Sequence, residues 1–200
     1  GYACKDGELY EQFLRERREG AILRADDMRR KANAHFGFHI TMDDIEREHF
    51  KKDAPLHTMH VVRAFARRLS KKAGATYLEY FDKGKIAYSD LCRPLPENAI
   101  KIVHALGGVA VLAHPGRIRL SFEEREALMC RLIGCGLDGI ECDYTTHTLE
   151  ETEYFKEFAR AHGLLQTGGS DFHAEGQANV LGSPAFDADE RLLSAFRLPS

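Results

Sequence analysis

The segment VAVLAHPGR, residues 109–117, decides the expected fold, because a short apolar run passes directly into polar residues. The same arrangement recurs at residues 139–144 and 164–173, where apolar residues give way to carboxylates and a histidine. Short apolar strands that alternate with helices predict an α/β protein with a parallel sheet, either open or closed into a barrel. The predicted strands are Val109–Ala113, Gly139–Cys142 and Leu164–Thr167.

The helices expected between these strands carry start signals in the sequence. Pro96 stands at the first helical position, where its missing N–H costs nothing. Ser121 with Glu124, and Thr148 with Glu151, predict capping boxes. The expected apolar faces of the first and last helix are Ala99, Ile102, Val103 and Leu106, and Tyr154, Phe155, Phe158 and Ala159.

The chain before residue 93 has a different pattern, which is charged and helical with few β-branched runs. A helix opening near Leu9 and a second helical run over 21–35 are expected, with Gly37 as the break and Thr41 as the next N-cap. The sequence therefore predicts three parts: a link at residues 1–20, a small all-helical module at 21–93 and an α/β part at 94–200.

Composition excludes several classes of protein. Of 200 residues, 44% are hydrophobic and 30% charged, and the net charge is −3, so no strong overall field attracts nucleic acid or an anionic membrane, although local patches remain compatible with it. No apolar run approaches the roughly 18 residues of a membrane span. The five cysteines form no CxxC pair, which favours reduced thiols in a cytoplasmic protein. They are Cys4, Cys92, Cys130, Cys135 and Cys142.

Chemistry-bearing side chains follow each predicted strand. The carboxyl ends of parallel strands open into one crevice, so His114, Glu141, Asp171 and His173 are expected to converge there. Histidine together with carboxylate suits zinc or manganese. If the backbone stays extended after the third strand, Asp171 and His173 point to the same side.

Each of these residues also has a structural interpretation. A single histidine at a strand end is often a hydrogen-bonded structural residue, and Asp171 fits the cap of the following turn. The sequence does not show which group fixes the tautomer of a ligating histidine. Gly168 and Gly169 predict close backbone approach or unusual φ angles beside Asp171.

Three segments carry a family resemblance: AHPGR at 113–117, GLDGIE at 136–141 and GGSDFH at 168–173. In order and spacing they resemble the last three motifs of the polymerase and histidinol phosphatase (PHP) family of metal-dependent phosphoesterases. Residues 58–65 and 80–85 resemble the helical insertion of a bacterial branch that acts on nucleotides and short oligonucleotides.

The resemblance implies a distorted seven-stranded β/α barrel with up to three divalent ions, Mn, Fe or Zn. It implies Asp171 as a ligand of the first metal, His114 of the second and His173 of the third. Arg117 is a candidate for phosphate contact, because its planar fork pairs with phosphate oxygens, with a surface salt bridge as the alternative. His147 is a candidate for lining the site, with a solvent-exposed loop histidine as the alternative.

Two departures from the family pattern bear on activity. The opening motifs of the family, which supply most metal ligands, do not occur, so each metal would keep one ligand of this chain, whereas such sites need three or more. Thr58 is followed by Met59, where relatives often carry arginine. An incomplete barrel is therefore expected.

The leading functional hypothesis is hydrolysis of a phosphate mono- or diester of a nucleotide or short oligonucleotide, impaired in this chain unless the missing ligands are supplied. One alternative is a non-catalytic remnant or interaction module, and another is a histidinol-phosphatase-like enzyme, which the helical insertion disfavours. An opened barrel exposes edges and apolar surface, which predicts a homodimer or an aggregation-prone chain.

Overall fold

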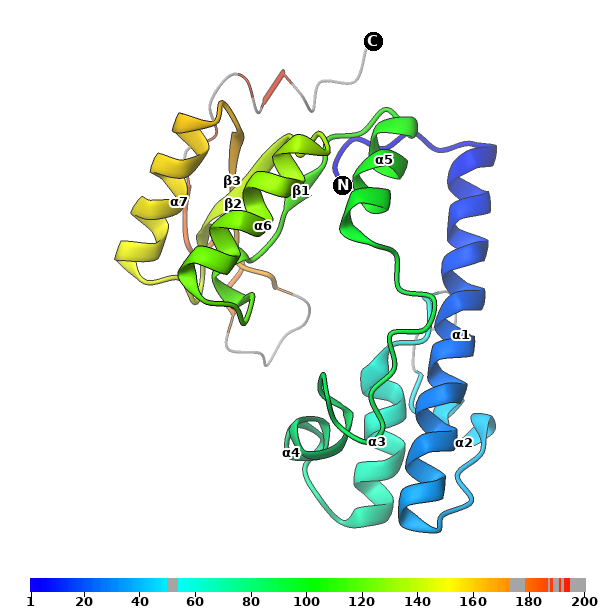
Figure 1. Ribbon diagram of the computed structural model, residues 1–200. Helices are drawn as coiled ribbons and strands as arrows, with labels where there is room; N and C mark the ends of the chain where they lie inside the picture. The colour runs from blue at the N-terminus through cyan, green and yellow to red at the C-terminus, as the bar shows by residue number, and fades with distance from the viewer. Residues whose placement is uncertain (50–53, 173–178, 187, 189–190, 192, 195–200) are drawn as a thin grey trace. The chain divides into compact units, whose positions relative to one another are not determined.

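The computed structural model describes residues 1–49, 54–172, 179–186, 188, 191, 193 and 194. The chain forms two compact units (Figure 1). The helical unit spans Gly7–Pro94, and the α/β unit joins Gly1–Asp6 to Leu95–Ser200. The division predicted from the sequence, with a link at residues 1–20, a helical module at 21–93 and an α/β part at 94–200, remains a proposal.

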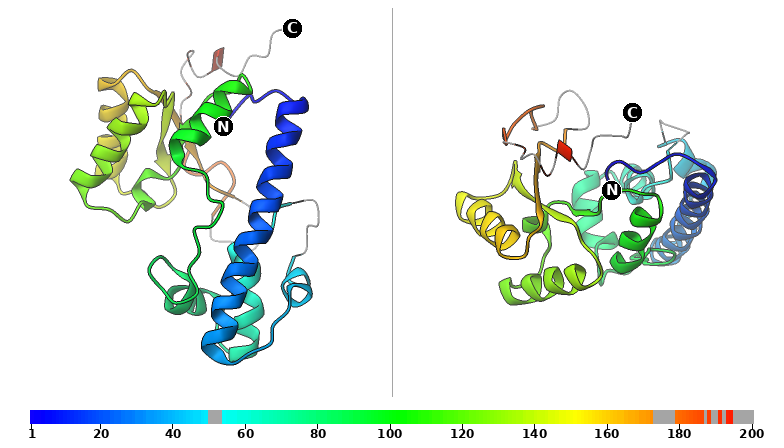
Figure 2. Two further views of the ribbon diagram at one scale, coloured as in Figure 1. Left: turned by 45° about the vertical axis from the view of Figure 1, so that its right-hand side comes forward. Right: turned by 90° about the horizontal axis from the view of Figure 1, so that it is seen from above.

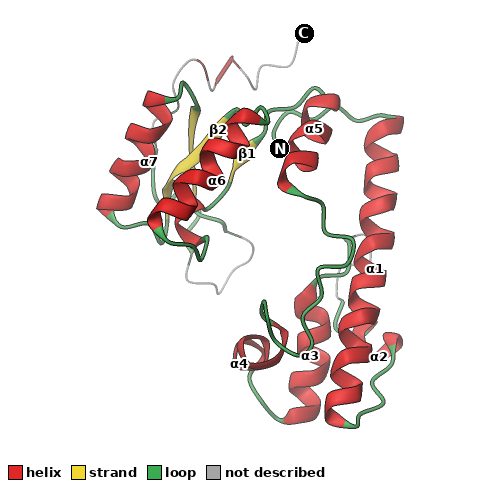
Figure 3. Cartoon of the chain, viewed as in Figure 1, coloured by secondary structure: helices red, strands yellow, loops and turns green. Residues whose placement is uncertain are grey.

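In the described residues of the helical unit, the regular secondary structure is helical, and loops connect the helices (Figure 3). They are α1 (Glu8–Phe36), α2 (Met42–Glu46), α3 (Thr58–Leu69), α4 (Ala73–Thr76) and a π-helical turn (Tyr77–Phe81). The expectation of two separate helices before Gly37 is wrong, because α1 runs through Gly20 without a break. Gly20 allows close packing there, since a Cβ would lie 2.8 Å from the Cβ of Cys92.

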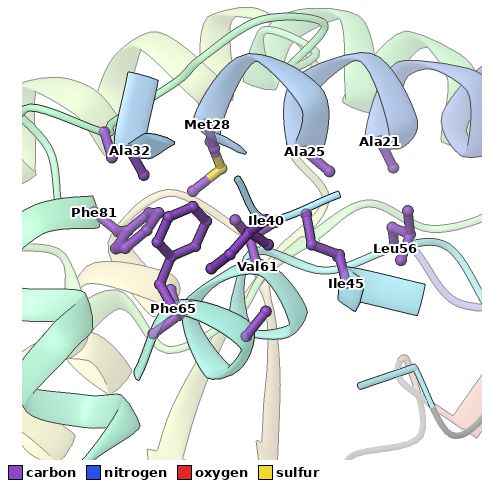
Figure 4. Packing of buried hydrophobic residues seen from close by; sticks show 13 residues of the cluster. Ala21, Ala25, Met28, Ala32, Ile40, Ile45, Leu56, Val61, Phe65 and Phe81 are labelled. Atoms are coloured by element: carbon purple, nitrogen blue, oxygen red, sulfur yellow. The ribbon is translucent and has the colours of Figure 1, made fainter. Parts of the chain in front are cut away.

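Small residues on one side of α1 let the shorter elements approach it closely (Figure 4). Ala21, Ala25 and Ala32 are buried and contribute little bulk, while Phe65 of α3 and Phe81 fill the space with rings 5.7 Å apart. Full burial of such large apolar side chains stabilises the unit by about 1.5–3 kcal/mol each. Thr41 is the N-cap of α2, as expected, and it forms a capping box with Asp44.

The α/β unit has a three-stranded parallel sheet in the order β1-β2-β3, which confirms the α/β class. The strands are β1 (Val111–Leu112), β2 (Gly139–Tyr144) and β3 (Leu165–Gly169), and the helices are α5 (Pro96–Ala105), α6 (Phe122–Gly134) and α7 (Leu149–Ala161). Both crossovers step to the next strand, so right-handed connections place α6 and α7 on one face of the sheet (Figure 2).

The capping boxes expected before α6 and α7 are confirmed, and so is Pro96 at the start of α5. The apolar face of α5 is centred differently from the prediction. Ile100 is the buried residue within the helix, while Ile102 and Val103 are half-buried; of the predicted face, Leu106 is buried and Val103 packs against the core. The difference arises because Ile100 joins the core of α6, α7 and β2.

Two irregularities shape the sheet edges. Tyr2 and Val109 form an antiparallel bridge with two N–H···O bonds of 2.9 Å, so the regular part of β1 is shorter than predicted. Between β2 and β3 the register shifts between Glu141 and Asp143, the mark of a β-bulge. No helix within the described residues is long and apolar enough to cross a bilayer.

Candidate metal-binding site

His114 stands at the carboxyl end of β1, immediately before the 3₁₀ turn Pro115–Arg117. Its backbone is left-handed, with φ 50° and ψ 50°. The backbone N–H of His114 donates to Glu141 Oε2 at 2.8 Å, and the ring Nδ1 lies 2.6 Å from the same oxygen. Because a carboxylate accepts, Nδ1 carries the proton and Nε2 keeps its lone pair. Glu141 is therefore the tautomer-fixing partner that the sequence did not identify.

Glu141 is buried on β2. A Cβ on Gly169 would lie 3.2 Å from Glu141 Oε1, so the glycine pair after β3 allows the close approach that the sequence predicted. Tyr2 lies in the same neighbourhood. Burial, followed by the charge of Glu141, raises the pKa of the Tyr2 phenol above its ordinary value. The carboxylate thus sits in a partly desolvated environment where its contact with His114 is strengthened.

Asp171 follows β3 and places Oδ1 3.6 Å from His114 Nε2. The backbone does not stay extended at Asp171, where φ is 52°, so the condition under which Asp171 and His173 would point to the same side is not met. The left-handed turn redirects the carboxylate toward β1. Around a tetrahedral ion with bonds of about 2.1 Å, two ligand atoms lie about 3.4 Å apart, so this pair fits a shared or neighbouring ion. His173, the third predicted ligand, lies outside the described residues.

Tyr144 connects the predicted metal ligand to the predicted phosphate contact. Its hydroxyl accepts from Arg117 Nη1 at 3.0 Å and donates to Asp171 Oδ2 at 3.2 Å. Its buried ring lies 4.4 Å from the ring of His114. The hydrogen bond to Tyr144, with the nearby Asp171 charge, raises the pKa of the exposed Arg117 guanidinium. Arg117 thus remains a cation at this edge.

His147 is brought to the same edge of the sheet but turns both ring nitrogens to the backbone. Gly116 N–H donates to Nε2 at 3.2 Å, and Nδ1 lies 2.9 Å from Cys142 O. Nδ1 therefore carries the proton, and neither nitrogen is left for a ligand in this arrangement. A Cβ on Gly116 would lie 2.6 Å from the His147 ring, so the glycine permits this contact.

The structure therefore brings His114, Glu141 and Asp171 together, as the strand-end pattern anticipated, and links Arg117 to Asp171 through Tyr144. Within the described part of the chain, no group of three or more histidine, cysteine, aspartate or glutamate side chains is arranged to hold a metal. Tyr144 was missed because residues 141 and 144 fall on opposite faces of a regular strand. The bulge between Glu141 and Asp143 brings both to His114.

Several curated relatives match part of the chain. A 3',5'-nucleoside bisphosphate phosphatase of Chromobacterium violaceum is 34% identical over 107 residues, covering 54% of this chain and 38% of the relative. A phosphoribosyl 1,2-cyclic phosphate 1,2-diphosphodiesterase of Eggerthella lenta is 36% identical over 99 residues, 50% of this chain and 36% of the relative. The 5'-3' exoribonuclease Rnm of Escherichia coli K12 is 34% identical over 97 residues, which cover 48% of this chain and 33% of the relative. The matches thus span little more than a third of these relatives.

Solved structures share the fold as well. An amidohydrolase of Chromobacterium violaceum with bound sulfate matches with a TM-score of 0.71 and 28% identity, over 85% of this chain and 60% of that one. A protein of Bifidobacterium adolescentis, named as a metal-dependent phosphoesterase, matches with a TM-score of 0.71 and 26% identity. The match covers 94% of this chain and 66% of that one. No model of a known protein family matches the chain.

The chain is therefore similar, in sequence and in fold, to proteins that are named as a phosphatase, a diphosphodiesterase and a metal-dependent phosphoesterase. These similarities support the resemblance to the PHP family that the three strand-end motifs indicated.

Proposed function

We propose that this chain contributes metal ligands and a phosphate contact to a phosphoesterase that hydrolyses phosphate mono- or diesters of nucleotides or short oligonucleotides. The observation that carries the proposal is the placement of His114 Nε2 3.6 Å from Asp171 Oδ1, with Glu141 holding the other imidazole nitrogen. The printed activities of the three relatives, all on phosphate esters, support the substrate class.

The donor set fits a divalent ion of the manganese, iron or zinc type. An imidazole nitrogen with a free lone pair and a carboxylate oxygen are ligands that such ions accept. His114 and Asp171 would hold metal, with His173 as the third ligand from this chain. Bound metal would lower the pKa of a water molecule and offset charge on the phosphoryl oxygens.

The remaining residues bind and orient. Arg117 is the residue of this chain that would pair with a phosphate oxygen through its planar fork. Tyr144 fixes the guanidinium and the Asp171 carboxylate relative to each other by hydrogen bonds of 3.0 and 3.2 Å. Phosphoryl transfer depends mainly on such positioning and on charge stabilisation.

We further propose that the three-stranded sheet is part of a distorted seven-stranded barrel and that the helical unit is an insertion into it. The fold neighbours, which are longer than this chain, support this reading. The free state of all five cysteines among the described residues supports a cytoplasmic setting. A homodimer that supplies further ligands would complete the metal site.

A non-catalytic role remains the second candidate, because the described part of the chain brings only two ligand side chains together. A protein that binds no metal in this arrangement would retain the fold for interaction alone.

Metal binding decides between the two. Calorimetric titration of the chelator-treated chain with Mn²⁺ or Zn²⁺ is expected to show binding at this site. The metal-loaded chain is then assayed for hydrolysis of a nucleoside bisphosphate. Asp171→Asn should lower the affinity at least about tenfold, because a ligand is lost. His104→Gln is the matched control, since His104 pairs with Asp138 at 2.8 Å outside the site. Equal effects of both substitutions, or the absence of binding, would favour the non-catalytic role.

A further inference from the structure

The helical unit has basic side chains on α1, at the start of α3 and in the segment before Pro94, which we call the basic cluster. Its members are Arg17, Arg24, His57, His60, Arg63 and Arg93. None of them belongs to the strand-end site of the α/β unit. Their surroundings differ from those of the other arginines in this unit.

The segment before Pro94 is held along α1. Arg17 Nη1 donates to Cys92 O at 2.8 Å, and a Cβ on Gly20 would meet the Cys92 side chain. Arg24 lies seven residues after Arg17, which is two helical turns, so both emerge from the same face of α1. Arg93 directly follows Cys92. These contacts bring three guanidinium groups to one side of the helix.

The start of α3 meets α1 at the same level. Leu56 packs in the core with Ala21 and Ala25 of α1 (Figure 4). His57, the next residue, is the N-cap of α3. It therefore lies beside the turn of α1 that carries Arg24.

Two histidines at this helix start have a defined tautomer. His57 Nδ1 accepts the N–H of Met59 at 3.2 Å, and His60 Nδ1 accepts the N–H of His57 at 2.9 Å. A nitrogen that accepts in a neutral imidazole leaves the proton on the other one. Both rings therefore present Nε2–H, a donor, and have no lone pair for a metal.

The cluster has no counterion within the described residues. None of its four arginines lies within ion-pair distance of a carboxylate there, whereas other arginines of the same unit are paired. The pairs are Arg29 with Asp26, Arg47 with Asp44, and Arg67 with Glu48. The lack of carboxylate partners is therefore specific to the basic cluster, because acidic residues are available to other arginines of the unit.

Like charges in this cluster repel one another. Burial, followed by Arg93 and Arg17, lowers the pKa of Arg24. Burial, followed by Arg24, Arg93 and Arg63, lowers the pKa of His57. Holding cations together costs free energy that a bound anion would offset.

We propose that the basic cluster binds phosphate groups of a nucleotide or short oligonucleotide through Arg24, Arg63 and Arg93 and the Nε2–H donors of His57 and His60. Guanidinium forks match phosphate oxygens, and imidazole N–H groups add directed hydrogen bonds. Arg93 also lies 5.6 Å over the ring of Tyr88. The choice of a nucleotide phosphate rests on the proposed function, but binding at this cluster requires no metal.

The test is fluorescence anisotropy of a 5'-labelled single-stranded RNA pentamer with the whole chain, in EDTA and low salt. The double substitution Arg24→Gln/Arg93→Gln is expected to weaken binding about tenfold or more and to reduce the slope of log K against log salt by about 1.4. Arg24→Lys/Arg93→Lys should restore part of the affinity.

Arg30→Gln/Arg47→Gln is the matched control, because it removes the same charge from two exposed, carboxylate-paired arginines of the same unit. Loss in the cluster variant with a change below about twofold in the control supports the proposal. Equal losses would reveal a net-charge effect and overturn it, and so would an absence of binding. Competition with a nucleoside 3',5'-bisphosphate distinguishes a single nucleotide from a strand as the ligand. The anisotropy assay contains EDTA and the metal titration contains no RNA, so failure of the metal site and failure of this cluster remain separable.

Discussion

Histidines in the two units present opposite chemistry to their surroundings. At the end of β1, the Nδ1–H of His114 donates to the Glu141 carboxylate, so Nε2 keeps a lone pair. At the start of α3, Nδ1 of His57 and Nδ1 of His60 accept backbone N–H groups, so Nε2 carries a proton. His147 uses both nitrogens on the backbone.

The difference lies in what each Nδ1 meets. A carboxylate partner prepares an imidazole as a metal ligand, whereas a backbone N–H partner prepares it as a hydrogen-bond donor to an anion. The surrounding charge agrees with each role, because Glu141 and Asp171 flank His114 while arginines surround His57. Identical side chains therefore predict different ligands once their tautomers are known.

The largest expected effect comes from Glu141→Gln. An amide can still contact Nδ1 of His114 but no longer supplies the negative charge that fixes the tautomer. Metal affinity should fall about 10–100-fold, as for loss of such partners in general. Calorimetric titration with Zn²⁺ or Mn²⁺ measures it.

Asp138→Asn is a close control for that substitution. Asp138 Oδ2 also accepts a backbone N–H, from Ala110 at 2.7 Å, and also lies 2.8 Å from an imidazole nitrogen, Nε2 of His104. Asp138 therefore makes the same two kinds of contact as Glu141, but its imidazole partner is not a predicted metal ligand. Unchanged metal affinity in Glu141→Gln, or an equal drop in both variants, would contradict the special role of the Glu141–His114 pair.

An intermediate effect is expected from pH on the helical unit. Burial, then His49, His57 and Arg63, lowers the pKa of His60 to about 4, and the pKa of His57 is also lowered. The unfolded chain therefore takes up protons first, and stability falls as pH decreases from about 6.5 toward 4. Protonation also removes the capping acceptors, so the loss should be about 1–2 kcal/mol.

Urea unfolding at pH 7 and pH 4.5 measures this loss. The double substitution His57→Asn/His60→Asn keeps a side-chain acceptor at both positions without a titrating group. It should flatten the pH dependence that is specific to α3. The same pH dependence in the variant and the parent chain would show that the two imidazoles are not responsible.

Sequence patterns predicted well those features that depend on local signals. The capping boxes at Ser121 and Thr148, the position of Pro96 and the parallel strands all follow from short-range chemistry. His114 and Asp171 were found because they follow strands that end at a common edge. These signals need no knowledge of tertiary contacts.

Features that depend on irregular backbone were not predicted. Tyr144 reaches the site through a bulge, and Asp171 turns back through a left-handed residue, neither of which the sequence pattern indicates. Histidine is an uncommon N-cap, so the capping box of His57 and His60 gave no recognisable signal. The continuation of α1 through Gly20, where Cys92 approaches the helix closely, was also not predicted.

The smallest effect is expected from alanine substitution of Gly20, which packs against Cys92. Gly134 of the α/β unit provides the comparison. Gly20→Ala would place a Cβ 2.8 Å from the Cβ of Cys92, so α1 or the neighbouring segment must shift. Gly134→Ala at the end of α6 would meet nothing within 4 Å. Alanine improves helix propensity by about 0.8–1 kcal/mol at an unobstructed position. Gly134→Ala should therefore stabilise the chain slightly, while Gly20→Ala should lose this gain and destabilise it by about 1 kcal/mol.

Denaturant unfolding of both variants measures the difference. If Gly20→Ala were as stabilising as Gly134→Ala, the close packing of α1 on Cys92, and with it the placement of Arg17 and Arg93 side by side, would be wrong.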